Sequence, residues 1–503
     1  MNRKLAHFFC VFLVLICSVE CLAGDEPQMI MANLVNTGNP YLEKLVAVNQ
    51  QTITFLDKER AATTGLIESF HGSSVYYYDD ASKQYYPDKE GILDQQGFTY
   101  DLALVVMVYT LNGQYQKAKQ ILKVLEQNFS VEKNGHIGLL NSYKINDFNG
   151  QDEYSLEIGI DGDRIHVGPN MWIALAALQF NKMTGTRQFL PFAVEVAKWA
   201  YNLPHYVMKD GSRGAVCMGS GWGPDWSTVF STENIIDNYA VLNWLEQIYQ
   251  AGTEMERRVF TAKGFGLKKI QEEKESIKQW LLKIGFNREY RSFNCGYNEF
   301  GVDKTKALDT VSWGISGIGP AVLASWGIDP FKMVDFAEQN FQVYQEIKGE
   351  PITGFDFTDE KYKDPHRPRI IWWEGTGQMI VMYQVMADYC RQLGDIDRMV
   401  SCQRKAMQYL AEMDKMSRMA RLPYGVLPYT SIQPKDTELV NTFFYGWEIP
   451  RGKNGHWVTS LASTMWRAIG SIGFNPLVSE QTTIGMLQDL NTKMWAKLDT
   501  VSQ

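Results

Sequence analysis

Two carboxylates, Glu233 and Asp237, are the residues of this sequence whose spacing most directly suggests chemistry. Residues four positions apart share one face of a helix, so both side chains point the same way. The surrounding segment, 235–248, is apolar on most sides and predicts a buried helix. A carboxylate on a buried face costs several kcal/mol unless it is satisfied or has a function. The pair therefore predicts a functional site, although Ser231 or Thr232 beside it also indicates an ordinary helix cap.

Three further carboxylates, Asp101, Asp309 and Glu374, stand where other apolar segments begin. Each of them alone also has a structural explanation, because the helix dipole favours acidic residues in a first turn. Glu374 follows two tryptophans and precedes Gly375 and Gly377, which weaken a first helical turn. Glycines at such positions indicate either the close approach of a ligand or backbone, or tight packing against a neighbouring helix.

Polar and aromatic side chains accompany these carboxylates in a combination that suits a sugar chain. Pyranose rings present apolar C–H faces to aromatic rings, and their hydroxyls need hydrogen-bond donors and acceptors. The candidate sugar-binding residues are Tyr100, Asn170, Trp222, Trp226, Trp313, Trp372, Trp373, Gln378 and His456. Further aromatic residues in the predicted loops are Trp447, Trp457, Tyr85, Tyr86, Tyr429 and Tyr445.

The reaction that suits convergent carboxylates without a metal is glycoside cleavage. One carboxyl must protonate the leaving oxygen, which requires a raised pKa, and another must activate water or attack the anomeric carbon. We assign the acid role to Glu233 and the base role to Asp101 or Glu374, with Asp237 and Asp309 completing the candidate catalytic set. The sequence has no C-x-x-C pair and no Cys/His cluster with zinc spacing, so we expect no metal or cofactor.

Six apolar helices must position these residues, and they form an internal repeat. The predicted helices cover 102–109, 171–180, 235–248, 311–323, 379–389 and 458–469, and each follows a loop rich in glycine, proline or aromatic residues. More charged helices with one apolar stripe follow most of them, at 116–127, 189–201, 254–284, 330–341 and 395–413. The segment 40–70 supplies a leading helix of the second kind.

The repeat predicts an all-α fold, an (α/α)6 toroid in which six inner helices are surrounded by outer helices. A linear superhelix of helical hairpins is the alternative, but its repeats usually stay alike, whereas these loops are long and differ from one another. In a closed toroid all inner helices begin at the same end. The residues at their starts, Asp101, Asn170, Glu233, Asp309, Glu374 and His456, should therefore converge on one pit.

Five short motifs occur in order over about residues 98–456. They are Thr99-Tyr100-Asp101, Val167-Gly168-Pro169-Asn170, Ser231-Thr232-Glu233-Asn234 with Asp237, Asp309-Thr310 with Trp313-Gly314, and Trp373-Glu374-Gly375-Thr376 with Gln378-Met379. As a set they resemble a bacterial group of exported six-hairpin glycosidase-like proteins. The resemblance implies the (α/α)6 toroid and a polysaccharide-directed role, and it brings no catalytic assignment with it.

The composition excludes several other classes of protein. The chain has 503 residues, of which 45% are hydrophobic, and a net charge of -8. It is therefore too apolar for disorder and lacks the basic surplus that binds nucleic acid. The basic Asn2-Arg3-Lys4, the apolar stretch 5–19 and the small residues around Ala23 predict a secretory signal peptide at 1–23. An uncleaved anchor helix and lipoprotein processing at Cys21 are the alternatives.

The predicted mature protein is a single toroidal domain over 24–503, with no membrane span, exported to the periplasm or the cell exterior and monomeric. Its cysteines are Cys217, Cys295, Cys390 and Cys402, which could be free thiols or form one or two disulfides, most simply Cys390 with Cys402.

Two other functions remain open on the sequence. A polysaccharide lyase or epimerase would need a Tyr or His base and a cation for the uronate, from among Tyr100, Tyr239, His456, Arg164 and Arg213. The acidic pit argues against such an anionic substrate, because like charges repel. A non-catalytic sugar-binding or polysaccharide-assembly protein would need the aromatic residues but no carboxyl with a raised pKa. We expect a hydrolase acting on a polysaccharide or oligosaccharide.

Overall fold

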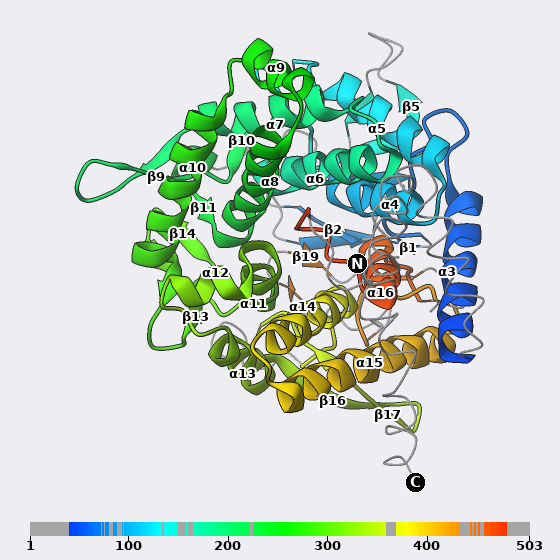
Figure 1. Ribbon diagram of the computed structural model, residues 1–503. Helices are drawn as coiled ribbons and strands as arrows, with labels where there is room; N and C mark the ends of the chain where they lie inside the picture. The colour runs from blue at the N-terminus through cyan, green and yellow to red at the C-terminus, as the bar shows by residue number, and fades with distance from the viewer. Residues whose placement is uncertain are drawn as a thin grey trace, which may run out of the picture.

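Six inner helices form a closed ring. The computed structural model describes residues 40–71, 73–74, 76–79, 84–87, 93, 95–132, 135–148, 156–158, 164–221, 225–358, 369–423, 425–432, 443–444, 447–448, 451–452 and 457–479. The inner helices are α4 (Thr99–Leu111), α6 (Val167–Thr184), α8 (Thr232–Ala251), α11 (Leu308–Trp313) continued by the π-helix η3 (Gly314–Ile318), α14 (Trp373–Gln392) and α16 (Leu461–Ile472). Each contacts the next, and α16 contacts α4, so the ring closes and the linear superhelix is excluded (Figure 1).

An outer layer of helices surrounds this ring. Its members are α3 (Pro40–Glu59), α5 (Tyr115–Phe129), α7 (Leu190–Asn202), α9 (Glu254–Lys263), α10 (Leu267–Trp280), α13 (Pro330–Phe341) and α15 (Ile396–Met419). Each inner helix contacts an outer one, as α14 contacts α15 and α16 contacts α3. The inner helices are buried along most of their length, whereas the outer ones bury a single stripe, which is the pattern that predicted two layers. The (α/α)6 toroid is confirmed.

Three helix boundaries differ from the prediction, each for a local reason. The predicted helix 254–284 is interrupted at Gly264, whose φ of +65° ends α9, and its last turn is the π-helix η2 (Leu281–Gly285). The predicted helix 311–323 begins earlier, at Leu308, and breaks at Gly319, whose φ is +95°; the short α12 (Pro320–Ser325) then starts with its proline at the first position. The predicted helix 458–469 begins later, at Leu461, because Ser460 caps it.

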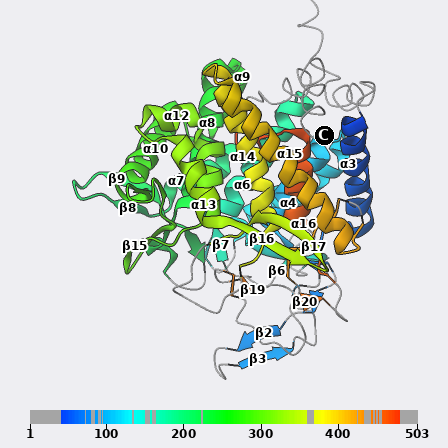
Figure 2. The ribbon, with the colours of Figure 1, turned by 90° about the horizontal axis from the view of Figure 1, so that it is seen from below.

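Short antiparallel strands lie between the helices along the chain, so the fold is mostly but not purely helical. They are β1 (Ser73–Ser74), β2 (Tyr76–Asp79), β3 (Gln84–Pro87), β4 (Gln96–Phe98), β5 (Ser142–Phe148), β6 (Leu156–Ile158), β7 (Arg164–His166), β8 (His205–Val207), β9 (Arg213–Val216), β10 (Gly219–Gly221), β11 (Phe230–Ser231), β12 (Phe286–Asn287), β13 (Ser292–Phe293), β14 (Gly296–Asn298), β15 (Gly301–Asp303), β16 (Gln342–Ile347), β17 (Glu350–Phe355), β18 (Phe443–Phe444), β19 (Trp447–Glu448) and β20 (Arg451–Gly452). Strands β6, β7, β16 and β17 lie on one side of the helical layer (Figure 2).

Three of these strands lead directly into inner helices. Strand β4 runs into α4, β7 into α6 and β11 into α8, with no residue between strand and helix. Strand β7 pairs with β10, and β11 pairs with β14. The extended backbone before each helix is therefore anchored, which fixes the direction of the first helical turn and of the side chains that it carries.

The two glycines after Glu374 are explained by close packing. A Cβ on Gly377 would lie 2.6 Å from the Cβ of Trp466 on α16, so this glycine lets two inner helices approach. A Cβ on Gly375 would lie 2.2 Å from the indole ring of Trp372. Of the two explanations left open by the sequence, helix packing accounts for Gly377, and room for a neighbouring indole accounts for Gly375.

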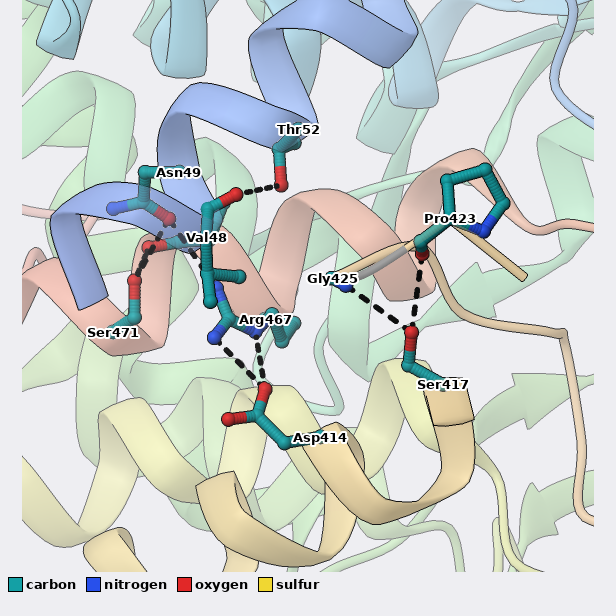
Figure 3. Close-up of polar contacts among 10 residues, drawn as sticks. Val48, Asn49, Thr52, Asp414, Ser417, Pro423, Gly425, Arg467 and Ser471 are labelled. Carbon is teal, nitrogen blue, oxygen red and sulfur yellow. Dashed lines mark hydrogen bonds and ion pairs between the residues drawn. The ribbon is translucent and has the colours of Figure 1, made fainter. Parts of the chain in front are cut away.

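A buried ion pair links the last inner helix, α16, to the outer helix α15, and its hydrogen bonds reach the first outer helix, α3. Arg467 on α16 is fully buried and donates from Nε and Nη2 to Asp414 Oδ1 on α15, at 3.1 and 2.8 Å. Its Nη1 donates to Asn49 Oδ1 on α3 at 3.3 Å, and Ser471 donates to the same oxygen (Figure 3). One guanidinium thus holds the last inner helix against two outer helices.

No disulfide joins the described cysteines Cys217, Cys295, Cys390 and Cys402. In the part of the chain that the structure describes, no helix is long and apolar enough to cross a membrane.

Candidate active site

A cavity of about 340 Å³ lies where the inner helices begin. All five predicted catalytic carboxyls line it, from the N-terminal ends of four different helices: Asp101 of α4, Glu233 and Asp237 of α8, Asp309 of α11 and Glu374 of α14. Aromatic residues form much of the wall: Phe70, Phe98, Tyr100, Trp172, Phe357, Trp372 and Tyr429. No lysine or arginine stands among the described residues that line this cavity.

Glu233 and Asp309 form a hydrogen-bonded pair of carboxyls. Burial raises the pKa of Glu233 well above its usual range, and the neighbouring Asp309, Asp237 and Glu374 raise it further. A hydrogen bond between the two carboxyls raises the pKa of Glu233 and lowers that of Asp309. Burial nevertheless raises the pKa of Asp309 to about 7, against a lowering by the backbone N–H of Thr310. Glu233 is therefore the member of the pair that holds the proton.

Asp237 lies one turn below Glu233 and is fully buried. Burial raises its pKa well above the usual range, and the hydrogen bond from the indole N–H of Trp313 to its Oδ1, at 2.6 Å, opposes this rise. Trp313 belongs to a cluster with Trp172 and Trp466, whose ring centroids lie 5.6 to 5.8 Å apart. These three indoles from α6, α11 and α16 fill the centre of the ring beneath the carboxyls.

Glu374 and Tyr100 form a second hydrogen-bonded group. Burial and the nearby Asp101 raise the pKa of Glu374 to about 8, while hydrogen bonds from Tyr100 and Gln378 oppose the rise. The amide of Gln378 lies 3.2 Å from Glu374 Oε1. The Tyr100 hydroxyl in turn accepts from the indole N–H of Trp466 at 2.6 Å. Gln378 thus holds the side chain of Glu374 in place, and Trp466 holds that of Tyr100.

Burial alone raises the pKa of Asp101. Its pKa is about 7, and a hydrogen bond with Ser69 lowers it. The sequence suggested that the helix-start dipole would lower the pKa of these carboxyls. In the structure burial outweighs the dipole at all five positions, because every one of them lies in the closed interior of the ring.

Five of the predicted sugar-binding residues that the structure describes lie outside the cavity lining. Asn170 is buried and binds backbone, since its amide bonds both the N–H and the C=O of Leu139 at 2.8 and 3.0 Å. Trp373 is fully buried, whereas its neighbour Trp372 lines the cavity. Trp313 and Gln378 act on the site through Asp237 and Glu374. Trp226 packs against His166 beside the cavity, and Trp222 and His456 lie outside the described residues.

His166, Asn141 and Trp172 also line the cavity, although they are not among the residues predicted from the sequence. His166 directly precedes the motif Val167-Gly168-Pro169-Asn170, so its place at a helix start could have signalled it. Asn141 comes from a loop and carried no such signal. Among the described residues, no group of three His, Cys, Asp or Glu side chains is arranged to hold a metal ion.

The raised pKa of Asp101 predicts how the stability of the protein depends on pH. Between the usual pKa of 3.8 and about 7 the folded state keeps a proton that the unfolded state loses. Stability should therefore fall as the pH rises through this window, by up to about 1.4 kcal/mol per pH unit for this group. Asp101→Asn should remove that contribution and flatten the profile. Urea unfolding from pH 4.5 to 7.5 tests this, with the exposed Asp397→Asn as control. Identical slopes for wild type and Asp101→Asn would contradict it.

Comparisons with known proteins identify the fold. No protein-family model and no curated protein matches the sequence. Among solved structures, a GH76 alpha-mannanase from Bacteroides thetaiotaomicron matches with a TM-score of 0.50 and 10% identity, over 92% of this chain and 99% of that one. The chain has the six-hairpin glycosidase fold.

Two other solved structures are similar to this six-hairpin chain. A wild-type glycosidase has a TM-score of 0.48 and 10% identity, over 87% of this chain and 98% of that one. A sugar epimerase from a ruminal bacterium has a TM-score of 0.47 and 10% identity, over 85% and 98%.

Proposed function

We propose that this protein is a glycoside hydrolase that cleaves a neutral polysaccharide or oligosaccharide. The observation that carries the proposal is the set of five buried carboxyls in one aromatic-walled cavity. Their pKa values are all raised, so at least one remains protonated near neutral pH and can act as an acid. The absence of lysine and arginine from the described lining favours a neutral sugar over a uronate.

Glu233 is the proposed general acid. It holds a proton against Asp309, and it can deliver that proton to the glycosidic oxygen as the bond to the anomeric carbon breaks. Asp309 itself is a poor choice of base, because it is hydrogen-bonded to Glu233. A catalytic pair must flank the sugar, with about 5 to 9.5 Å between the two carboxyls. Asp309 instead raises the pKa of Glu233, the proposed acid.

Asp101 is the proposed base. Helix α4 stands opposite α11 in the ring, so Asp101 and Asp309 enter the cavity from opposite sides. Its pKa is raised less far than that of Glu374, and it is not bound to Tyr100. It can therefore ionise first and either take a proton from the attacking water or attack the anomeric carbon itself. Glu374 then serves to orient Tyr100.

The lyase alternative has little support in the described site. Of its candidate residues, Arg213 lies over Tyr201 and pairs with Glu273, and Tyr239 packs on Trp326, outside the cavity lining. Tyr100 lines the cavity, but burial and Glu374 raise its pKa well above the usual range, which makes it a poor base. The predicted signal peptide at 1–23 would bring the enzyme to polysaccharides outside the cytoplasm.

The test is the release of reducing sugar from a panel of polysaccharides. We expect release from at least one neutral polymer, with α-mannan and α- and β-glucans in the panel, and none from polyuronates. Product anomers followed by NMR then report inversion or retention. Binding to a polymer without any release would support the sugar-binding alternative instead. An unsaturated product absorbing in the ultraviolet would establish a lyase.

A further inference from the structure

His166 and Asn141 form a polar pair in the wall of the same cavity, to which the proposed chemistry gives no part. Both line it and both are more than nine-tenths buried, with exposed fractions of 8% and 6%. His166 Nδ1 lies 3.0 Å from Asn141 Nδ2.

The backbone holds this pair rigidly. The Asn141 N–H donates to the carbonyl of Arg164, and its carbonyl accepts from the N–H of Thr99 at the start of α4. The carbonyl of His166 accepts from the side chain of Asn170 at 2.8 Å. The indole of Trp226 packs edge-on against the imidazole, with 4.5 Å between ring centroids. The imidazole therefore cannot rotate freely.

The contact with Asn141 determines where the imidazole carries its proton. An amide nitrogen donates hydrogen bonds and does not accept them, so His166 Nδ1 must be the acceptor. A neutral ring then carries its hydrogen on Nε2. Burial and the nearby Arg164 lower the pKa of His166 to about 3, which keeps the ring neutral.

Two polar atoms of this pair lack partners in the part of the chain that the structure describes. His166 Nε2 and Asn141 Oδ1 are both buried without a hydrogen bond. A buried donor or acceptor left unsatisfied is costly, and such atoms at a cavity wall indicate a ligand that completes them. A buried donor and a buried acceptor in one cavity wall suit sugar hydroxyls, which can both give and take a hydrogen bond.

We propose that His166 is a substrate-binding residue whose Nε2–H donates to a hydroxyl of the sugar, and that Asn141 positions it by fixing this tautomer. The inference rests on the proposed function only in that the cavity binds a neutral sugar. It does not require that the bound sugar is cleaved.

The experiment measures sugar binding by calorimetry in the Glu233→Gln background, with mannobiose, cellobiose and maltose as probes. We expect His166→Phe, which keeps an aromatic ring but has no donor, to weaken the tightest of these complexes about 5- to 10-fold. His166→Gln places an amide N–H near the position of Nε2 and should retain most of the affinity. In Asn141→Asp the carboxylate accepts a hydrogen bond from His166 Nδ1–H, so Nε2 no longer carries the proton. This variant should weaken binding as much as His166→Phe.

A second measurement needs no ligand. Two-bond ¹H–¹⁵N spectra of the wild-type protein should show His166 neutral with its proton on Nε2, and Asn141→Asp should move that proton to Nδ1. A proton on Nδ1 in the wild type, or equal affinity in His166→Phe, would overturn the inference. Failure of the wild type to bind any probe would overturn it too. Binding that depends on His166, without any hydrolysis, would uphold it while removing the hydrolase proposal.

Discussion

Replacing Glu233 by glutamine is expected to lower kcat on a polysaccharide substrate by about 10³-fold, within the range that a general acid contributes. The reason is that the amide has nearly the shape of the carboxyl but cannot give a proton to the leaving oxygen. Glu233 holds a proton, and its hydrogen bond with Asp309 raises its pKa further. Substrate binding should change little, so the loss should appear in kcat rather than in KM.

The pH profile distinguishes loss of the acid from general damage. An acid must be protonated to act, so wild-type activity should fall as the pH rises through the pKa of Glu233 in the complex. In Glu233→Gln this alkaline limb should disappear. An aryl glycoside with an activated leaving group needs no protonation and should be largely spared.

The matched control for this variant is Glu246→Gln, on the same helix α8. Glu246 pairs with Lys274 at 2.6 Å and lies outside the cavity lining. The same chemical change there should leave kcat unaltered and cost at most about 1 kcal/mol of stability. Full activity of Glu233→Gln on the natural polymer would refute the assignment of the acid.

Breaking the buried pair between Arg467 and Asp414 should produce the largest loss of stability among the substitutions proposed for this protein. Asp414→Asn leaves the guanidinium buried without a counter-charge, and we expect a loss of about 3 to 5 kcal/mol in the free energy of unfolding. Arg467 has no exposed surface through which water could compensate. Because it joins α16 to α15 and α3, the loss should appear as global unfolding, measured by urea or guanidinium denaturation (Figure 3).

Two further variants separate the cost of an unpaired charge from the value of the pair. The double variant Asp414→Leu with Arg467→Met removes both charges, and it should recover much of the lost stability. Asp335→Asn breaks the exposed pair with Lys332 and should cost at most about 1 kcal/mol. A loss of less than 1 kcal/mol in Asp414→Asn would contradict this account of ring closure.

The sequence by itself determined the fold and the convergence of the carboxyls. Apolar helices that recur six times can bury their surfaces only inside a second layer, so the toroid follows from periodicity. Once the ring closes, Asp101, Glu233, Asp309 and Glu374 must meet, because each stands in a first turn at the same end. That inference needed no knowledge of side-chain geometry.

The tertiary structure alone decided which neighbours of these residues face the cavity. Trp372 is the extended N-cap residue of α14 and lines the cavity, whereas Trp373 is the first helical residue and does not, and no sequence pattern separates two adjacent tryptophans. The pairing of Asn141 with His166 joins a loop to a strand end, and contacts of that kind are set by three-dimensional packing. Burial also set the pKa of each carboxyl, since desolvation inside the closed ring exceeds the local effect of the helix dipole that the sequence suggested.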